Sequence, residues 1–238
     1  MNKEFQGKLG EEYDLFKLAC PHYDELEQKL GESLALHFQG SSKSAINVLE
    51  IGCASGYTTD LLLAADPRIT VTAVDNEPIV IEQAKRNLDD YIQQGRLTII
   101  EADALQYLQV LPVELIDAFA SGFTLHNFEQ GYRAKCIGEL HRVLASGGLF
   151  ANADKYAHDN TIIHERELQW QLQQFVEKYT PIAREDLIAE WTEHYLKDNA
   201  LEYLMRENAS KKEMQTLGFR DVRTIYRKHM EAVVVGVK

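Results

Sequence analysis

The chain has 238 residues and a mass of 27.2 kDa, which fits one large domain or a domain with a modest insertion. Apolar residues make up 45% of it, enough for a core. A mean hydropathy of −0.32 and the lack of an apolar run of about twenty residues exclude a membrane span. A net charge of −12 disfavours non-specific contact with nucleic-acid phosphates.

The amino terminus and the cysteines indicate a cytoplasmic protein. The first residues, Met-Asn-Lys-Glu-Phe-Gln, lack the apolar segment of a secretory signal. The cysteines are odd in number and have neither disulfide nor zinc spacing: Cys20, Cys53 and Cys136. A reducing cytoplasm is therefore the expected location.

Residues 11–40 predict a helical arm ahead of the first strand. Apolar residues recur there at helical spacing, and Pro21 interrupts the run. The polar stretch 40–44 is a linker to the next element. The arm therefore consists of one or two helices that precede the sheet.

Residues 46–59 predict a strand, a turn of small residues and a helix. Gly52 and Gly56 can adopt backbone angles closed to other residues, and without a Cβ they let a ligand lie against the main chain. The following helix turns its free N–H groups and its positive dipole end toward this turn. The stretch therefore predicts a nucleotide-sized cradle at the carboxyl edge of a parallel sheet.

The next strand, residues 69–74, ends on Asp75. An acid at the end of a second parallel strand is placed to accept hydrogen bonds from both hydroxyls of a ribose. The alternative is that Asp75 caps the next helix, which is predicted to run from near Pro78 through Tyr91. The two roles are compatible.

Three further strands are predicted at residues 97–100, 115–121 and 149–153. His126 and Asn127 follow the fourth strand, and Asp154 ends the fifth. The carboxyl ends of parallel strands share one edge, where active sites of such sheets lie. We therefore expect these side chains on the functional edge.

Residues 156–205 predict helices only, which we interpret as a helical lid inserted after the fifth strand and defining the acceptor pocket. A capping box at Ser210–Glu213 predicts the start of a further helix. Residues 219–225 and 231–237 then predict a closing antiparallel hairpin. The expected fold is α/β, a Rossmann-like doubly wound seven-stranded sheet with an antiparallel last strand, in one domain over residues 1–238.

The chain resembles the class I S-adenosylmethionine-dependent methyltransferases from about residue 10 to its carboxyl end. The motifs that carry the resemblance are Glu50-Ile-Gly52-Cys-Ala-Ser-Gly56, Val74-Asp75-Asn76, Glu101-Ala-Asp103-Ala104 and Leu144-Ala-Ser-Gly147-Gly148. Ala54 departs from the pattern, because many members have a third glycine there. Its methyl group is small enough to keep the turn.

This resemblance implies S-adenosylmethionine as the cofactor and S-adenosylhomocysteine as the product. Asp75 would bind the ribose, and Asp103 would accept the exocyclic amine of the adenine, unless it only caps the short helix 104–109. The arm residues Tyr13 and Tyr23 would contact the cofactor, or would simply belong to the core. The cofactor-binding residues that we expect are Tyr13, Tyr23, Glu50, Gly52, Cys53, Ala54, Gly56, Asp75, Asn76, Asp103, Ala104, Ser121 and Gly122.

Methyl transfer from a sulfonium is an in-line displacement, to which a protein contributes mainly proximity, alignment and electrostatics. It needs no catalytic triad and no metal, and the histidines of this chain lack metal-ligand spacing. Where the acceptor must lose a proton, the best-placed bases are His126, Asp154 and His158. The leading interpretation is a methyltransferase that acts on a small molecule.

A second interpretation keeps the fold and changes the reaction. Three segments and the carboxyl hairpin also resemble the carboxy-S-adenosylmethionine synthases of wobble-uridine modification: Cys20-Pro-His-Tyr23, Asp75-Asn76 and Phe123-Thr-Leu125. That family makes a carboxylated cofactor from prephenate and needs an arginine in the late helical region. Here the corresponding position falls near Glu193-His194, with no arginine between Trp191 and Leu204, and Gly122 replaces that family's asparagine. Both departures argue against this enzyme, and the alternative also includes another enzyme related to tRNA modification.

A third interpretation is a nicotinamide-dependent oxidoreductase or a catalytically silent nucleotide-binding module. A dinucleotide fingerprint needs Gly-x-Gly-x-x-Gly. Counted from Gly52, this chain has Ala54 and Tyr57 at the second and third glycine positions. The ring of Tyr57 is bulky where the helix must pack closely on the strand, which disfavours NAD.

Basic residues crowd the last third of the chain: Arg206, Lys211, Lys212, Arg220, Arg223, Arg227 and Lys228. They form either a solvated basic face or a nucleic-acid patch. No aromatic or RNA-motif signature accompanies them, which favours the solvated face. Nucleic-acid and membrane partners are therefore not expected, and a homodimer is left open.

Overall fold

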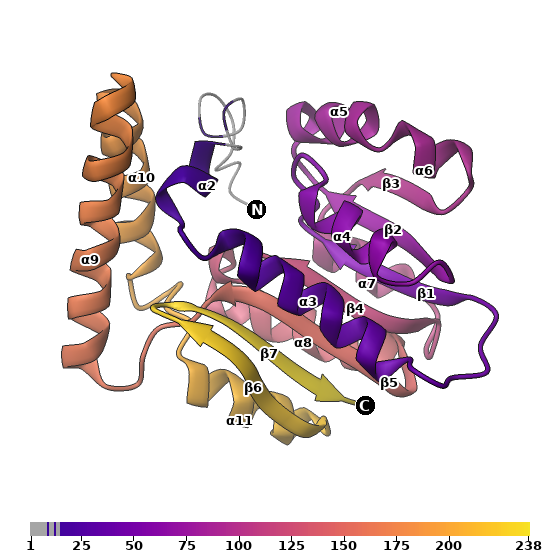
Figure 1. Ribbon diagram of the computed structural model, residues 1–238. Coiled ribbons are helices and arrows are strands. Elements are labelled where there is room, and N and C mark those ends of the chain that lie inside the picture. Colours follow the sequence, from indigo (N-terminus) through magenta and orange to yellow (C-terminus); the bar gives the residue numbers. More distant parts are fainter. Residues whose placement is uncertain (1–8, 10–11, 13–14) are drawn as a thin grey trace.

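The computed structural model describes residues 9, 12 and 15–238 (Figure 1). The predicted cofactor contact Tyr13 lies outside these residues. The strands form one seven-stranded sheet in the order β3-β2-β1-β4-β5-β7-β6. They are β1 (Ile46–Ile51), β2 (Ile69–Asp75), β3 (Leu97–Glu101), β4 (Ile116–Gly122), β5 (Leu144–Lys155), β6 (Arg220–Lys228) and β7 (Glu231–Val237).

The first five strands pair in parallel, and β7 pairs antiparallel to both β5 and β6. This arrangement confirms the predicted Rossmann-like sheet with its antiparallel closing hairpin. The helices are α2 (Phe16–Ala19), α3 (Tyr23–His37), α4 (Tyr57–Ala65), α5 (Pro78–Asn87), α6 (Asp89–Gln93), α7 (Ala104–Val110), α8 (Gln130–Val143), α9 (Thr161–Tyr179), α10 (Glu185–Asp198) and α11 (Glu207–Leu217). Two short 3₁₀ turns add η2 (Leu125–Asn127) and η3 (Thr180–Ile182).

The sheet separates two hydrophobic cores, because its central strands are buried on both faces. On β1, Val48 packs into the core beneath α3 and α4, whereas Leu49 and Ile51 pack into the core beneath α7 and α8. Alternate side chains of one strand point to opposite faces, so a continuous apolar run is what a central strand needs. No described helix is both long and apolar enough to cross a membrane.

A row of small residues on β4 lets α3 cross the sheet closely. Ala118 and Ala120 lie in the core beneath α3, and a Cβ built on Gly122 would lie 2.4 Å from the Glu27 carboxyl group of that helix. In Figure 1, α3 runs across the sheet beside α4. The start of α3 therefore lies at the carboxyl end of β4.

The arm also joins the sheet to the helical pair α9 and α10, which stands beside the sheet in Figure 1. The Phe16 ring of α2 lies 4.5 Å from that of Trp191 on α10 and 5.5 Å from that of Phe123, which follows β4. All three rings are buried. The predicted lid thus packs on the arm, and the arm packs on the strand ends.

Two local predictions are wrong. The helix predicted to run through Tyr91 breaks at Leu88, which separates α5 from α6. The capping box at Ser210 does not open a helix, because α11 already begins at Glu207. The Glu207 carboxylate is held by Lys211 of the same helix and by Arg227 of β6, so a tertiary ion pair fixes this helix start.

The glycine at position 56 gives a test of the turn. Gly56 has φ +95° and a Cβ there would lie 2.6 Å from Leu88 Cδ1, whereas a Cβ on Gly138 in α8 would meet nothing within 4 Å. Left-handed strain and overlap should make Gly56→Ala destabilising by about 2–4 kcal/mol in urea unfolding. Gly138→Ala should stabilise by about 0.5–1 kcal/mol through helix propensity. Equal effects of the two changes would contradict the assigned turn geometry.

Candidate functional site

The turn after β1 has the backbone that the sequence predicts. Gly52, Ala54 and Gly56 have φ values of +79°, +45° and +95°, in the left-handed region that glycine tolerates and alanine adopts at a cost. The space beside the glycines is not open, however. A Cβ on Gly52 would lie 2.0 Å from Thr124 Oγ1, and one on Gly56 would overlap Leu88.

The positions of the missing Cβ atoms are occupied by the protein's own side chains, and contact of a ligand with the main chain of this turn stays a prediction. What the turn offers a ligand is the amino-terminal end of α4. Its N-cap is Gly56, and no described side chain caps its first N–H groups. Such an end favours an anionic or hydrogen-bond-accepting group.

The Asp75 carboxylate faces this turn. Its Oδ2 accepts a hydrogen bond from the Ala54 N–H at 3.0 Å, and its Oδ1 accepts one from the Glu77 N–H at 3.0 Å. Burial raises the pKa of Asp75, and these backbone donors oppose the rise. The N-cap of α5 is Glu77, so Asp75 does not cap that helix itself. Asn76, which is half-buried, follows in the same loop.

Asp103 has the capping role that the sequence left as an alternative. It is the N-cap of α7, and its Oδ1 accepts from the Gln106 N–H (3.0 Å) and the Tyr132 hydroxyl (2.9 Å). Ala104 begins the helix and is buried. The predicted contact of Asp103 and Ala104 with the adenine stays a prediction. The Asp103 carboxylate is already held in place by its hydrogen bonds to Gln106 and Tyr132.

Several other predicted cofactor contacts have side chains engaged inside the protein. The Ser121 hydroxyl donates to the Ile51 carbonyl (2.9 Å), and Glu50 Oε2 accepts from the Thr59 hydroxyl (2.6 Å). Burial raises the pKa of Glu50 to about 8 and also raises that of the Cys53 thiol. Ser121, Glu50 and Cys53 are thus buried, and their contact with a cofactor stays a prediction.

The arm brings two residues to the carboxyl end of β4. Tyr23, which was predicted, is buried and stacks on Phe123 with 5.2 Å between ring centroids. Glu27, one helical turn further, was not predicted and lies against Gly122. A signal for it existed: Glu27 stands inside the apolar stripe Leu26, Leu30 and Leu34.

The structure brings two of the three predicted bases together. His126 Nδ1 lies 2.5 Å from Asp154 Oδ1, and both side chains are buried at the carboxyl ends of β4 and β5. Asp154 also accepts main-chain N–H groups of Leu125 (2.9 Å) and Lys155 (2.8 Å). His158 is not part of this pair, because its Nε2 contacts the His229 carbonyl oxygen (2.9 Å).

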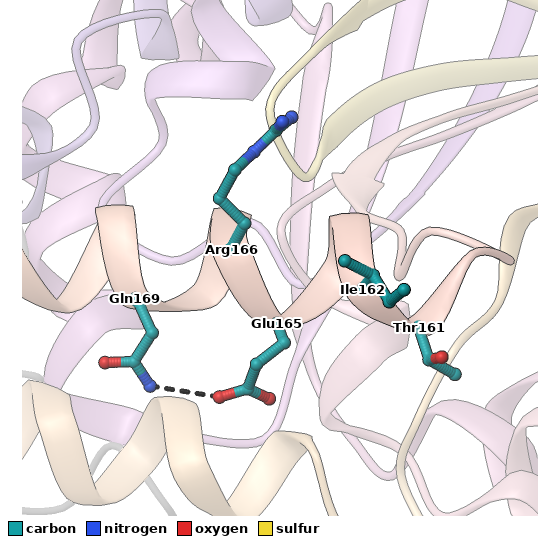
Figure 2. A pocket seen from close by; sticks show the side chains of 5 residues that line it. All are labelled: Thr161, Ile162, Glu165, Arg166 and Gln169. Carbon is teal, nitrogen blue, oxygen red and sulfur yellow. Dashed lines mark hydrogen bonds between the residues drawn. The ribbon is translucent and has the colours of Figure 1, made fainter.

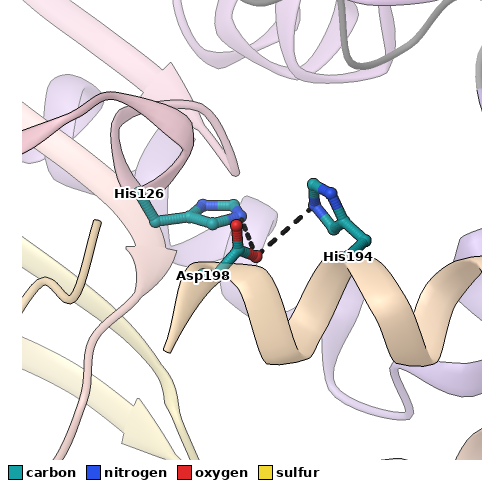
Figure 3. Close-up of side chains that lie close together, drawn as sticks. All are labelled: His126, His194 and Asp198. Atoms are coloured by element: carbon teal, nitrogen blue, oxygen red, sulfur yellow. Dashed lines mark ion pairs between the residues drawn. The ribbon is translucent and has the colours of Figure 1, made fainter. Parts of the chain in front are cut away.

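A buried cluster that the sequence did not predict lies on the other side of His126 (Figure 3). Asp198 Oδ2 of α10 is 3.6 Å from His126 Nε2 and 3.4 Å from His194 Nε2. One ligand atom from each of these residues lies within 4.8 Å of the others. The spacing of the histidines in the sequence does not reveal this cluster, because it forms only where α10 returns His194 and Asp198 to His126.

The charges identify this cluster as an ion-pair group rather than a metal centre. The Lys155 ammonium pairs with the same Asp198 oxygen that faces both histidines. Burial by itself would raise the pKa of Asp198, but Lys155 and the two histidines lower it to about 2. Burial lowers the pKa of His194 to about 3. A divalent cation would have to displace a buried ammonium from its carboxylate, so this donor set does not fit a resident metal.

The hollows on the outer face of the lid are separate from the site. Figure 2 shows one on α9, where the Gln169 side chain donates to Glu165 (3.1 Å). Ile162 in this hollow is 80% exposed. A second hollow lies on α10 and includes Ile188 and Leu196. Neither contains a residue of the strand ends.

Comparisons with known proteins agree with the fold. A family model described as a methyltransferase domain matches residues 48–148. A carboxy-S-adenosyl-L-methionine synthase of Yersinia enterocolitica is 22% identical over 165 residues, which is 68% of this chain and 59% of that protein. The match thus spans less than two thirds of that relative.

Two solved structures show the same fold at low identity. One is a Methanococcus maripaludis protein assigned as an S-adenosyl-L-methionine-dependent methyltransferase, with TM-score 0.63, 17% identity and coverage of 100% of this chain and 95% of that one. The other is PigF with SAH, with TM-score 0.56, 15% identity and coverage of 81% and 50%.

The ion pair between Lys155 and Asp198 predicts how substitutions of these two residues change the free energy of unfolding. Asp198→Asn should destabilise the protein by about 3–5 kcal/mol, because it leaves the Lys155 ammonium buried without a counter-charge. The double change Lys155→Met with Asp198→Leu removes both charges and should recover most of that loss. Urea unfolding of the three proteins measures both effects. A double variant that is no more stable than Asp198→Asn would refute the pairing.

Proposed function

Because the chain belongs to the class I S-adenosylmethionine-dependent methyltransferase family, we propose that it transfers the methyl group of S-adenosylmethionine to a small-molecule acceptor. One observation carries this proposal. The Asp75 carboxylate, at the end of β2, faces the Gly52–Gly56 turn at the end of β1. That arrangement supports an acid that binds the ribose beside a turn that receives the rest of the cofactor.

The strand order supports an extended cofactor along the carboxyl edge. Asp103 follows β3, Asp75 ends β2, and the Gly52–Gly56 turn follows β1, in the spatial order β3-β2-β1-β4. With the adenine at Asp103 and the ribose at Asp75, the methionyl part would reach the turn and Gly122 of β4. The predicted contacts thus follow one another as the parts of the cofactor do.

The proposed reaction is a direct displacement. A lone pair of the acceptor attacks the methyl carbon, the carbon–sulfur bond breaks, and the sulfur keeps its electron pair as S-adenosylhomocysteine. His126 would take the acceptor's proton at Nε2 while its Nδ1–H donates to Asp154. Asp154 holds the ring in that tautomer and stabilises the imidazolium that forms. His158 has no place in this step.

A small acceptor is favoured by what surrounds His126. The ring of Phe123, which follows β4, lies 6.5 Å from that of His126, and Phe16 of the arm packs on both Phe123 and Trp191 of the lid. The net charge of −12 disfavours a nucleic acid. Residues 156–205 would then determine the acceptor. A cytoplasmic location is supported by three cysteines that are all buried and free.

The carboxy-S-adenosylmethionine synthase reaction is the second candidate, supported by the relative of that name. The chain lacks the expected arginine, and its lid has Glu193 and the buried His194 at that place. An oxidoreductase or silent module has no comparable support. Methyl transfer is therefore the reaction that we propose.

Asp75 provides the first test. Asp75→Ala should weaken S-adenosylhomocysteine binding by about 1–3 kcal/mol, because the ribose hydroxyls lose their acceptor. Calorimetric titration measures this, with the exposed Asp90→Ala on α6 as the control of equal charge change. The change also removes the bond to the Ala54 N–H, so thermal unfolding of each protein is measured in parallel. An unchanged dissociation constant would reject the ribose role.

A second test concerns the acceptor. Methyl-labelled S-adenosylmethionine is incubated with the protein and a cell extract divided into small-molecule, nucleic-acid and protein fractions. Label should enter the small-molecule fraction. His126→Asn should lower that transfer by about 10²–10⁴-fold without changing S-adenosylhomocysteine affinity. Label in nucleic acid, or full activity of His126→Asn, would overturn the acceptor class or the base respectively.

A further inference from the structure

A carboxyl group is buried where the arm crosses the end of β4. Glu27 belongs to α3 and lies in the apolar stripe formed by Leu26, Leu30 and Leu34. It is only 1% exposed. A buried carboxyl group costs free energy unless hydrogen bonds or an opposite charge compensate it. Its partners therefore indicate whether it serves the fold alone.

The two carboxyl oxygens of Glu27 differ in their hydrogen bonding. Oε2 accepts a hydrogen bond from the Thr58 hydroxyl at the start of α4 (3.0 Å). Oε1 has no hydrogen-bond partner within the described part of the chain. A Cβ built on Gly122 would lie 2.4 Å from that oxygen. The unpartnered oxygen is thus directed to the main chain at the end of β4, beside the first turn of α4.

This place is where the proposed function puts the methionyl end of the cofactor. The nucleoside would occupy the ends of β3 and β2, so the remaining part extends to β1 and β4. In S-adenosylmethionine that part has two positive charges, the ammonium and the sulfonium. Resting on the proposed function, we propose that the Glu27 carboxylate binds the cationic methionyl end of S-adenosylmethionine.

The charges around Glu27 make this binding dependent on pH. Burial raises the pKa of Glu27 to about 8; the Thr58 hydrogen bond opposes the rise, Glu50 of β1 and Asp154 of β5 add to it, and Lys17 of α2 lowers it. The free protein therefore has a protonated Glu27 near neutral pH. A bound cation favours the ionised form, so Glu27 releases a proton when the cofactor binds.

The signs of the two pH effects are opposite. Cofactor affinity should rise with pH up to about 8, because the carboxylate must be ionised. In the free protein, the unfolded chain loses the Glu27 proton near its ordinary pKa and the folded chain only near 8. The contribution of Glu27 to folding stability is thus present at low pH and is lost as pH rises toward about 8.

The experiment compares three ligands and four proteins. S-Adenosylmethionine, S-adenosylhomocysteine and 5′-methylthioadenosine are titrated into the wild type, Glu27→Gln, Glu27→Asp and Glu32→Gln. Calorimetry at about pH 6 and about pH 8, in two buffers of different ionisation enthalpy, also counts protons. Glu32 is the matched control, since it lies on the exposed side of the same helix.

We expect Glu27→Gln to weaken the binding of S-adenosylmethionine at least about tenfold and to abolish the proton release that accompanies it. The affinity for 5′-methylthioadenosine should stay unchanged. Glu27→Asp should keep the proton release, and Glu32→Gln should match the wild type. An equal loss for S-adenosylhomocysteine assigns the contact to the ammonium. A loss confined to S-adenosylmethionine assigns it to the sulfonium.

Two results would overturn the inference alone: unchanged binding by Glu27→Gln, or an equal loss of all three ligands, which indicates a structural role. Thermal unfolding of each variant identifies a folding defect, and Glu27→Asp then decides by its proton release. A wild type that binds none of the ligands rejects the proposed function, and the Glu27 contact with it.

Discussion

The close approach of α3 to the sheet positions the arm and the lid. The helix lies over β4 and β5, where several residues have little or no side chain: Ala118, Ala120, Gly122, Ala151 and Ala153. This approach sets Tyr23 and Glu27 at the carboxyl edge of the sheet. It also positions α2, on which the lid packs through Phe16. Arm, lid and strand ends therefore form one continuous packed unit.

Buried carboxyl groups are concentrated at this edge. Glu50 and Asp154 both lie near Glu27, and Asp198 adds a fourth carboxyl group from the lid. Buried acids cost free energy unless a positive partner is near. For Asp198 that partner is Lys155, from within the chain. For Glu27 we infer a partner that the cofactor brings.

The regular elements of this chain follow from local sequence, and the sites depend on contacts that local sequence does not contain. The apolar period of residues 161–179 coincides with α9, and the strand runs coincide with β1 and β2, because burial on one or two faces imposes a period. Asp75 and Asp154 could be predicted at the carboxyl edge, since each ends a parallel strand.

What the sequence could not reveal is which inward polar groups meet. His126 and Asp198 are distant in the chain, and their pairing depends on how α10 packs on the arm. The start of α11 depends likewise on an ion pair with β6.

The close contact at Gly122 has a consequence for how the sequence can change in evolution. A larger residue there would collide with the side chains of positions 27 and 58, so these three positions should covary among homologues rather than drift independently.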